Sequence, residues 1–131
     1  MATTRPCTPA VIEGRKSKAE QFMKAAEIVR RNIDDIELAD ALITLSVHAG
    51  IAASDVICCT KSGVHPSGPN HFDAIQRLAE ADTNLARELK VLLSMKGKSG
   101  YGEDLSSKES AERAFDAATV LVKSALGIAS T

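Results

Sequence analysis

The chain has no tryptophan, one tyrosine and three phenylalanines, so aromatic residues make up only 3% of its 131 residues. A core with so few rings must be filled by small and aliphatic side chains. Alanine is abundant in this sequence, whereas the runs of β-branched residues that favour strands are missing. This composition favours helices that pack through small side chains.

Long apolar runs and a strong net charge are missing too. No stretch reaches the roughly 18 apolar residues that a membrane-spanning helix needs. The N-terminal segment MATTRPCTPAVIEGRK lacks the apolar centre of a secretory signal. The formal net charge is −1, which gives no global argument for a nucleic acid or a membrane as partner. We therefore expect a cytoplasmic protein of one domain.

Cysteine is scarce as well. The chain has three cysteines, of which Cys58 and Cys59 are adjacent, and it has no C-x-x-C motif. This pattern is not typical of a disulfide framework or of a zinc site. We expect the cysteines to be small buried hydrophobic residues, with no metal and no cofactor bound. A metal held by the histidines and the aspartate near the proline-rich loop is a minor alternative, with these ligands: His65, His71 and Asp73.

Capping patterns mark where helices are expected to start. The first 15 residues contain two prolines and a glycine, and we expect a flexible leader over residues 1–15. The SKAE segment at residues 17–20 has the form of a capping box, which predicts that the first helix begins there and ends near Asn32. A second box, SSKE at residues 106–109, predicts the start of the last helix.

Apolar residues at three- and four-residue steps define the helices in between. A second helix is expected over residues 36–61, with Gly63 ending it. A third is expected from Asn70 to Met95, kinked or broken at Asp82, where a new cap can form. Short polar connections between long amphipathic helices predict an all-α fold for residues 16–128. Its architecture would be an antiparallel up-down bundle of four or five helices.

The second helix contains the residues that raise a functional question. Ser46, Gly50 and Ser54 recur at four-residue spacing, and such a ridge of small side chains allows a second helix to approach closely, within the bundle or across a dimer. His48 and Asp55 are seven residues apart, which places them on the same side of this helix. They are either structural polar groups, each with its own hydrogen-bond partner, or a ligand-binding pair facing a cleft.

The order of three segments resembles the HEPN superfamily. They are SVHAGIAASDVICC on the second helix, HFDAIQRLAEA, and LKVLLSMKGKSGYGEDLSSKESAERAFDAATVLV, so the resemblance covers roughly residues 18–126. HEPN domains are compact helical domains, often dimeric, found in toxin–antitoxin modules and beside nucleotidyltransferases. Active members use an arginine followed a few residues later by a histidine. In this sequence Lys96 stands at the place of the arginine and Tyr101 at that of the histidine.

The resemblance therefore implies a non-catalytic, HEPN-like dimeric module for binding or regulation. A homodimer is expected, and a nucleotidyltransferase or an antitoxin is a further partner that the resemblance implies. Nucleic acid stays a candidate partner, and a membrane is not expected. The residues expected to bind the ligand or partner are His48, Asp55, Lys96, Lys98 and Tyr101.

Two alternatives of other classes remain open. One is a divergent metal-independent ribonuclease, with His48, Lys96 and Tyr101 brought together in space as its catalytic residues. The other is a purely structural helical bundle whose polar residues all serve packing.

Overall fold

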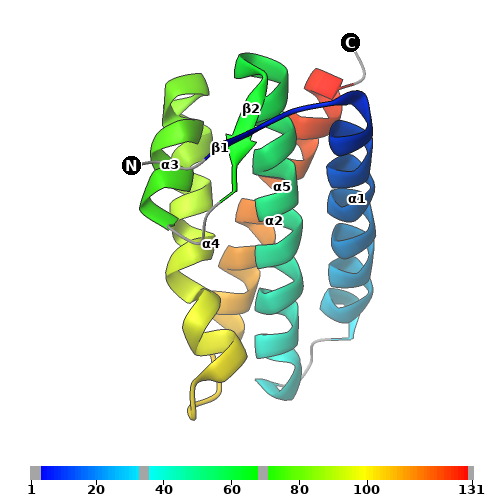
Figure 1. Cartoon of the computed structure of the whole chain (residues 1–131). Helices are drawn as coiled ribbons and strands as arrows, with labels where there is room; N and C mark the ends of the chain where they lie inside the picture. Colours follow the sequence, from blue (N-terminus) through cyan, green and yellow to red (C-terminus); the bar gives the residue numbers. More distant parts are fainter. Residues whose placement is uncertain (1–3, 33–35, 68–70, 130–131) are drawn as a thin grey trace.

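A computed structural model describes residues 4–32, 36–67 and 71–129 of the chain. Five α-helices and one small two-stranded sheet form this part, which confirms the predicted all-α bundle (Figure 1). The helices are α1 (Pro9–Arg31), α2 (Ala39–Ser62), α3 (His71–Ala81), α4 (Thr83–Tyr101) and α5 (Lys108–Ala129); a short 3₁₀ helix, η1 (Ile36–Leu38), precedes α2, and the strands are β1 (Thr4–Pro6) and β2 (Val64–Pro66).

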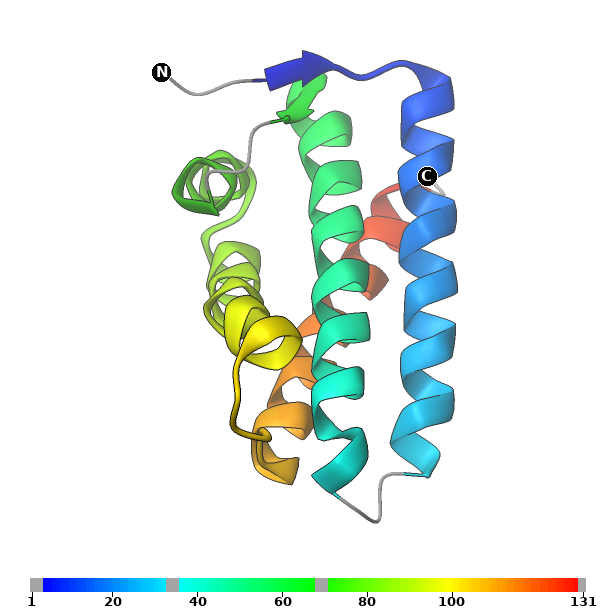
Figure 2. The ribbon, with the colours of Figure 1, turned by 60° about the horizontal axis from the view of Figure 1, so that its bottom comes forward.

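Helix α2 is the centre of the bundle. It packs against α1, α4 and α5, and Figure 2 shows it between α1 on one side and α4 on the other. Helix α3 is seen almost end-on in that view, so it does not follow the direction of α1 and α2. In the part of the chain that is described, α2 alone has the length and composition of a membrane-crossing helix. Since 78% of that apolar window is buried in the bundle, its composition is that of a core helix.

The N-terminal segment differs from the predicted flexible leader. Helix α1 begins at Pro9, and its N-cap is Thr8, whose Oγ1 accepts a hydrogen bond of 3.2 Å from the amide of Val11. A proline in the first helical turn needs no hydrogen-bond partner for its nitrogen, so it favours a helix start. The SKAE segment lies inside α1 and is not its cap. The prediction of a leader over residues 1–15 and of a start at Ser17 is therefore wrong for the described residues.

The same N-terminal segment forms the sheet. Strand β1 pairs with β2 in antiparallel register, with Arg5 opposite His65. The amide of Cys7 then donates a hydrogen bond of 2.9 Å to the carbonyl of Gly63, the residue that ends α2 in a left-handed conformation (φ 77°). Strand β1 and Cys7 are thus held against the C-terminal end of the central helix.

Three predicted boundaries are confirmed, and the predicted end of α4 is wrong. Asp82 caps α4 by accepting hydrogen bonds from the amides of Asn84 (2.8 Å) and Leu85 (3.1 Å). Asn32 ends α1 and Gly63 ends α2, as expected. Helix α4, however, continues past Met95 to Tyr101, so the KGKSGY segment is helical and not a turn.

The last helix starts one residue later than its predicted cap. Ser107 caps α5, because its Oγ accepts a hydrogen bond of 3.1 Å from the amide of Ser110. The amide of Ser106 instead donates to Oδ2 of Asp40, at the start of α2. The predicted cap at Asn70 lies outside the described residues.

The ridge of small residues on α2 packs inside the chain. Ser46 and Ser54 are buried, and a Cβ placed on Gly50 would overlap the Cδ1 atom of Leu92 in α4 and lie 3.3 Å from that of Leu121 in α5. The missing side chain of Gly50 therefore permits a close approach of three helices. Because the ridge is buried in one chain, the alternative of a dimer interface through these residues is wrong.

Candidate functional site

A cavity of about 250 Å³ lies between α2 and α4, and we call it the α2–α4 cavity. It brings together three residues that are far apart in the sequence and were predicted as site residues: His48, Lys96 and Tyr101. Lys96 and Ser99, three residues apart, share one face of α4, and Tyr101 is the last residue of that helix. The side chains that line the cavity are Thr44, Val47 and His48 from α2 and Lys96, Ser99 and Tyr101 from α4.

Hydroxyl groups connect the two walls of this cavity. Thr44 Oγ1 donates a hydrogen bond of 3.3 Å to Ser99 Oγ, and Ser99 Oγ lies 3.3 Å from the carbonyl oxygen of Lys96. Tyr101 stands at the rim with 89% of its surface exposed. The cavity thus combines an ammonium group, an imidazole and three hydroxyls, a set suited to hydrogen-bond an anionic or polar ligand.

His48 is held against α1 and not by a carboxylate. Its ring stacks on the ring of Phe22, with 5.3 Å between centroids and 29° between planes. No ion pair in the described part of the chain joins His48 to a carboxylate. The stacking fixes the plane of the imidazole ring against α1.

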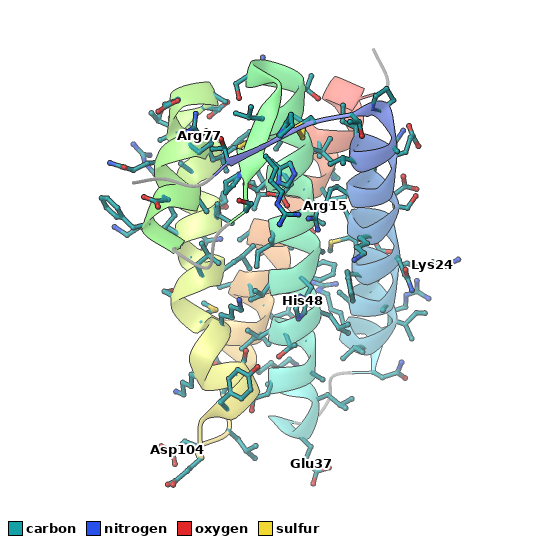
Figure 3. The ribbon with its side chains drawn as sticks, viewed as in Figure 1. Arg15, Lys24, Glu37, His48, Arg77 and Asp104 are labelled. Atoms are coloured by element: carbon teal, nitrogen blue, oxygen red, sulfur yellow. A yellow bond between two sulfur atoms is a disulfide. The ribbon has the colours of Figure 1, made fainter. Side chains whose placement is uncertain are left out.

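Asp55 does not form a pair with His48. The two lie on the same side of α2, as predicted, but two turns apart, which is about 10.5 Å along a helix axis. Each faces its own residue of α1: His48 faces Phe22, and Oδ2 of Asp55 lies 3.5 Å from Nε of Arg15. Figure 3 shows Arg15 and His48 at different heights between α1 and α2. The structure therefore does not bring His48 and Asp55 together as a pair, which agrees with the alternative that each has its own partner.

The environment of Asp55 is unusual for a carboxylate. Its residue is 8% exposed, and burial raises the pKa of its carboxyl from 3.8 to about 6. The nearby charges of Arg15 and His65 lower the pKa but do not offset the loss of hydration. Asp55 is therefore a buried acid whose proton occupancy changes in the mildly acidic range.

Lys98 does not take part in the α2–α4 cavity. Its side chain is exposed and is not among the residues that line the cavity, and its carbonyl accepts the hydrogen bond from Gly102 that ends α4. The expectation that Lys98 helps to form the same site is not supported by its position.

Two residues of α1 were not predicted from the sequence: Phe22, which contacts His48, and Arg15, which contacts Asp55. Phe22 and Arg15 are seven residues apart, the same spacing as His48 and Asp55 on the antiparallel helix α2. That matched spacing was the available signal, since antiparallel neighbours of equal spacing meet in pairs. Thr44 and Ser99 had no signal of their own in the sequence.

The cysteines also differ from expectation. Cys7 and Cys59 form a disulfide, with 5.5 Å between their Cα atoms, so the prediction of unpaired hydrophobic residues is wrong for these two. The pairing of β1 with β2 brings Cys7 to the end of α2, a non-local contact that cysteine spacing does not reveal. The prediction is confirmed for Cys58, which is free and buried.

Burial also makes the Cys58 thiol unreactive. It raises the pKa of that thiol to about 11, and the negative charge of Asp55 adds to the effect. The thiolate is the nucleophile in disulfide exchange, and at neutral pH this shift keeps almost all of the Cys58 thiol protonated.

Among the described residues, the ligands of the alternative metal site are not grouped around a common position. His65 is 3% exposed, and its Nδ1 lies 2.8 Å from the carbonyl oxygen of Pro66. The side chain of His71 lies outside the described part. Within that part, no three histidine, cysteine or acidic residues are grouped as metal ligands.

The fold and these contacts define an all-α helical-bundle protein with a polar cavity beside its central helix. A scan against protein-family models finds no matching family, and a search of curated proteins finds no match.

Proposed function

We propose that the chain is a non-catalytic, HEPN-like module for binding or regulation that acts as a homodimer. The observation that carries this proposal is the α2–α4 cavity, in which His48, Lys96 and Tyr101 meet although they come from two helices. The cavity offers several hydrogen-bonding side chains, and among the described residues no carboxylate orients His48 as a base. Such a site suits the binding of a ligand or partner. A nucleotidyltransferase or antitoxin partner is part of the same proposal and follows from the resemblance. The cytoplasmic location is also part of it and rests on the N-terminal segment, which lacks the apolar centre of a secretory signal.

The rim of the cavity favours a protein partner. Tyr101 is 89% exposed and Leu105, a few residues further on, is 59% exposed. Both lie at the end of the bundle where α4 leads into α5. Exposed aromatic and aliphatic residues beside a polar cavity are typical of interface anchors, because an aromatic ring contributes much contact area at little cost in conformational entropy. The second copy of the chain would cover this rim.

Replacement of Tyr101 tests the dimer. We expect the wild-type chain to sediment as a dimer and Tyr101→Ala to weaken the dimer at least about tenfold, since truncating an aromatic anchor costs more than about 1.4 kcal/mol. Analytical ultracentrifugation over a dilution series measures this. The matched control is Phe72→Ala, which removes an exposed aromatic residue from α3 and should leave the dimer unchanged. A wild-type chain that stays monomeric at high concentration contradicts the proposal.

A divergent metal-independent ribonuclease is the second candidate, favoured by the same gathering of His48, Lys96 and Tyr101 around one cavity. Lys96 would hold a phosphate as a point charge. The absence of an oriented base among the described residues leads us to expect that the purified chain leaves single-stranded and structured RNA intact. RNA cleavage that His48→Ala and Lys96→Ala abolish, but that the neighbouring Lys98→Ala retains, would establish the ribonuclease instead.

A further inference from the structure

A second cavity, of about 330 Å³, lies at the opposite end of α2 from Tyr101, and we call it the N-terminal cavity. It is an open cavity lined by the small sheet and the first turns of α1. Four basic side chains from three elements line it: Arg5 of β1, Arg15 and Lys18 of α1, and His65 of β2. None of the described residues that line it is acidic.

The charges around this cavity are only partly compensated. Arg15 is the one lining residue with an ion pair, and this pair uses its Nε, 3.5 Å from Asp55. The two terminal nitrogens of its guanidinium remain for a ligand. Arg5 and Lys18 are exposed and form no ion pair within the described part of the chain. Three permanent cations against one carboxylate leave an excess of about two positive charges, in a chain whose formal net charge is −1.

The cavity is held in shape before any ligand arrives. Arg5 lies opposite His65 in the β1–β2 ladder, and two residues later the chain is fixed by the Cys7–Cys59 disulfide. Asp55, buried behind Arg15, fixes the guanidinium from the other side. A site whose charged groups are held by rigid elements loses little entropy when it binds.

We propose that the N-terminal cavity binds a small soluble phosphate monoester. A phosphate monoester carries about −1.5 to −2 charges at neutral pH, which matches the excess charge of the cavity. The planar fork of an arginine pairs with two phosphate oxygens at once, and lysine adds a point charge. The volume of about 330 Å³ lies in the range of small-molecule sites, which fits a small phosphate monoester. The site is separate from the α2–α4 cavity and does not depend on the function proposed for that cavity.

Calorimetric titration with inorganic phosphate and with glycerol 3-phosphate, at constant ionic strength, tests the proposal. We expect saturable binding of glycerol 3-phosphate to the wild-type chain. The double variant Arg5→Gln/Lys18→Gln should bind at least about tenfold more weakly, because each substitution removes a charge-assisted hydrogen bond to the phosphate. Both residues are exposed, so the helical circular dichroism should not change.

A matched variant separates a specific site from general charge attraction. Lys24→Gln/Lys90→Gln removes the same two charges from exposed positions of α1 and α4 outside the cavity, and Figure 3 shows Lys24 on the outer face of α1. It should bind as the wild type does. The proposal is overturned by no saturable binding to the wild-type chain, or by equal weakening in both double variants. Binding to vesicles that contain phosphatidic acid, without binding of either soluble phosphate, would overturn it as well.

Discussion

Cys7→Ser is expected to lower the free energy of unfolding by about 4 kcal/mol. The disulfide joins residues that are 52 positions apart. A cross-link over a loop of that length lowers the conformational entropy of the unfolded chain, and this stabilises the folded state by about 4 kcal/mol. The substitution also removes the covalent link between the end of β1 and α2, so that only the β1–β2 ladder and the backbone hydrogen bond to Gly63 still hold the strand there. For a domain of this size, such a loss is a large share of the total stability.

Denaturation by urea, with and without a reducing agent, measures this effect. The reducing agent should lower the midpoint of the wild-type chain to that of Cys7→Ser and leave the variant unchanged. Cys58→Ala is the matched control, since Cys58 is free, and its unfolding should still respond to reduction. Alkylation of the denatured, unreduced wild-type chain at three thiols instead of one would contradict the disulfide.

The second large effect is a dependence of stability on pH that resides in Asp55. Its pKa is about 6 in the folded chain, whereas an unfolded aspartate has a pKa of about 3.9, so the folded state binds the proton more tightly. The stability that protonated Asp55 provides is complete below about pH 4 and is lost as the pH rises to about 6. A difference of about two pKa units corresponds to about 3 kcal/mol between these limits.

Asp55→Asn should remove this dependence, because the amide does not titrate and resembles the protonated carboxyl in shape. The difference in unfolding free energy between variant and wild type should therefore grow in favour of the variant from pH 4 to pH 6 and stay constant above. Urea denaturation at several pH values measures it. Asp104→Asn, in the exposed loop after α4 (Figure 3), should keep the wild-type profile. Parallel profiles for Asp55→Asn and the wild type would contradict the buried acid.

The helices could be predicted because their signals are local. Asp82 caps α4 through amides two and three residues away, and Gly63 ends α2 because a left-handed residue is needed there. The start of α1 was missed although its signal is local too: Thr8 and Pro9 form a cap and a first turn. Two prolines close together were interpreted as a loop, while a proline in a first turn favours a helix.

The end of α4 and the contacts between elements could not be predicted in this way. Glycines at positions 97 and 100 each cost the helix about 1 kcal/mol relative to alanine. The hydrogen bond from Thr44 to Ser99 ties this last part of the helix to α2. The Cys7–Cys59 disulfide and the Arg15–Asp55 ion pair join residues that are far apart in the sequence, so a single sequence contains no direct signal for them.

The candidate site could be predicted only in part, because it too depends on contacts between residues that are far apart in the sequence. The residue types of His48, Lys96 and Tyr101 were suggestive, and their gathering follows from the packing of α4 on α2. His48 and Asp55 do not meet, because residues seven positions apart share one side of a helix but are separated by two turns along its axis.

Fluorescence of Tyr101 tests most directly whether the rim of the α2–α4 cavity is where a second copy binds. The chain has one tyrosine and no tryptophan, so its tyrosine emission comes from Tyr101 alone. Quenching by acrylamide is to be measured over a dilution series that takes the chain from dimer to monomer. We expect strong quenching in the dilute monomer, where Tyr101 is exposed, and much weaker quenching in the concentrated dimer. Equal quenching at both ends of the series would contradict it.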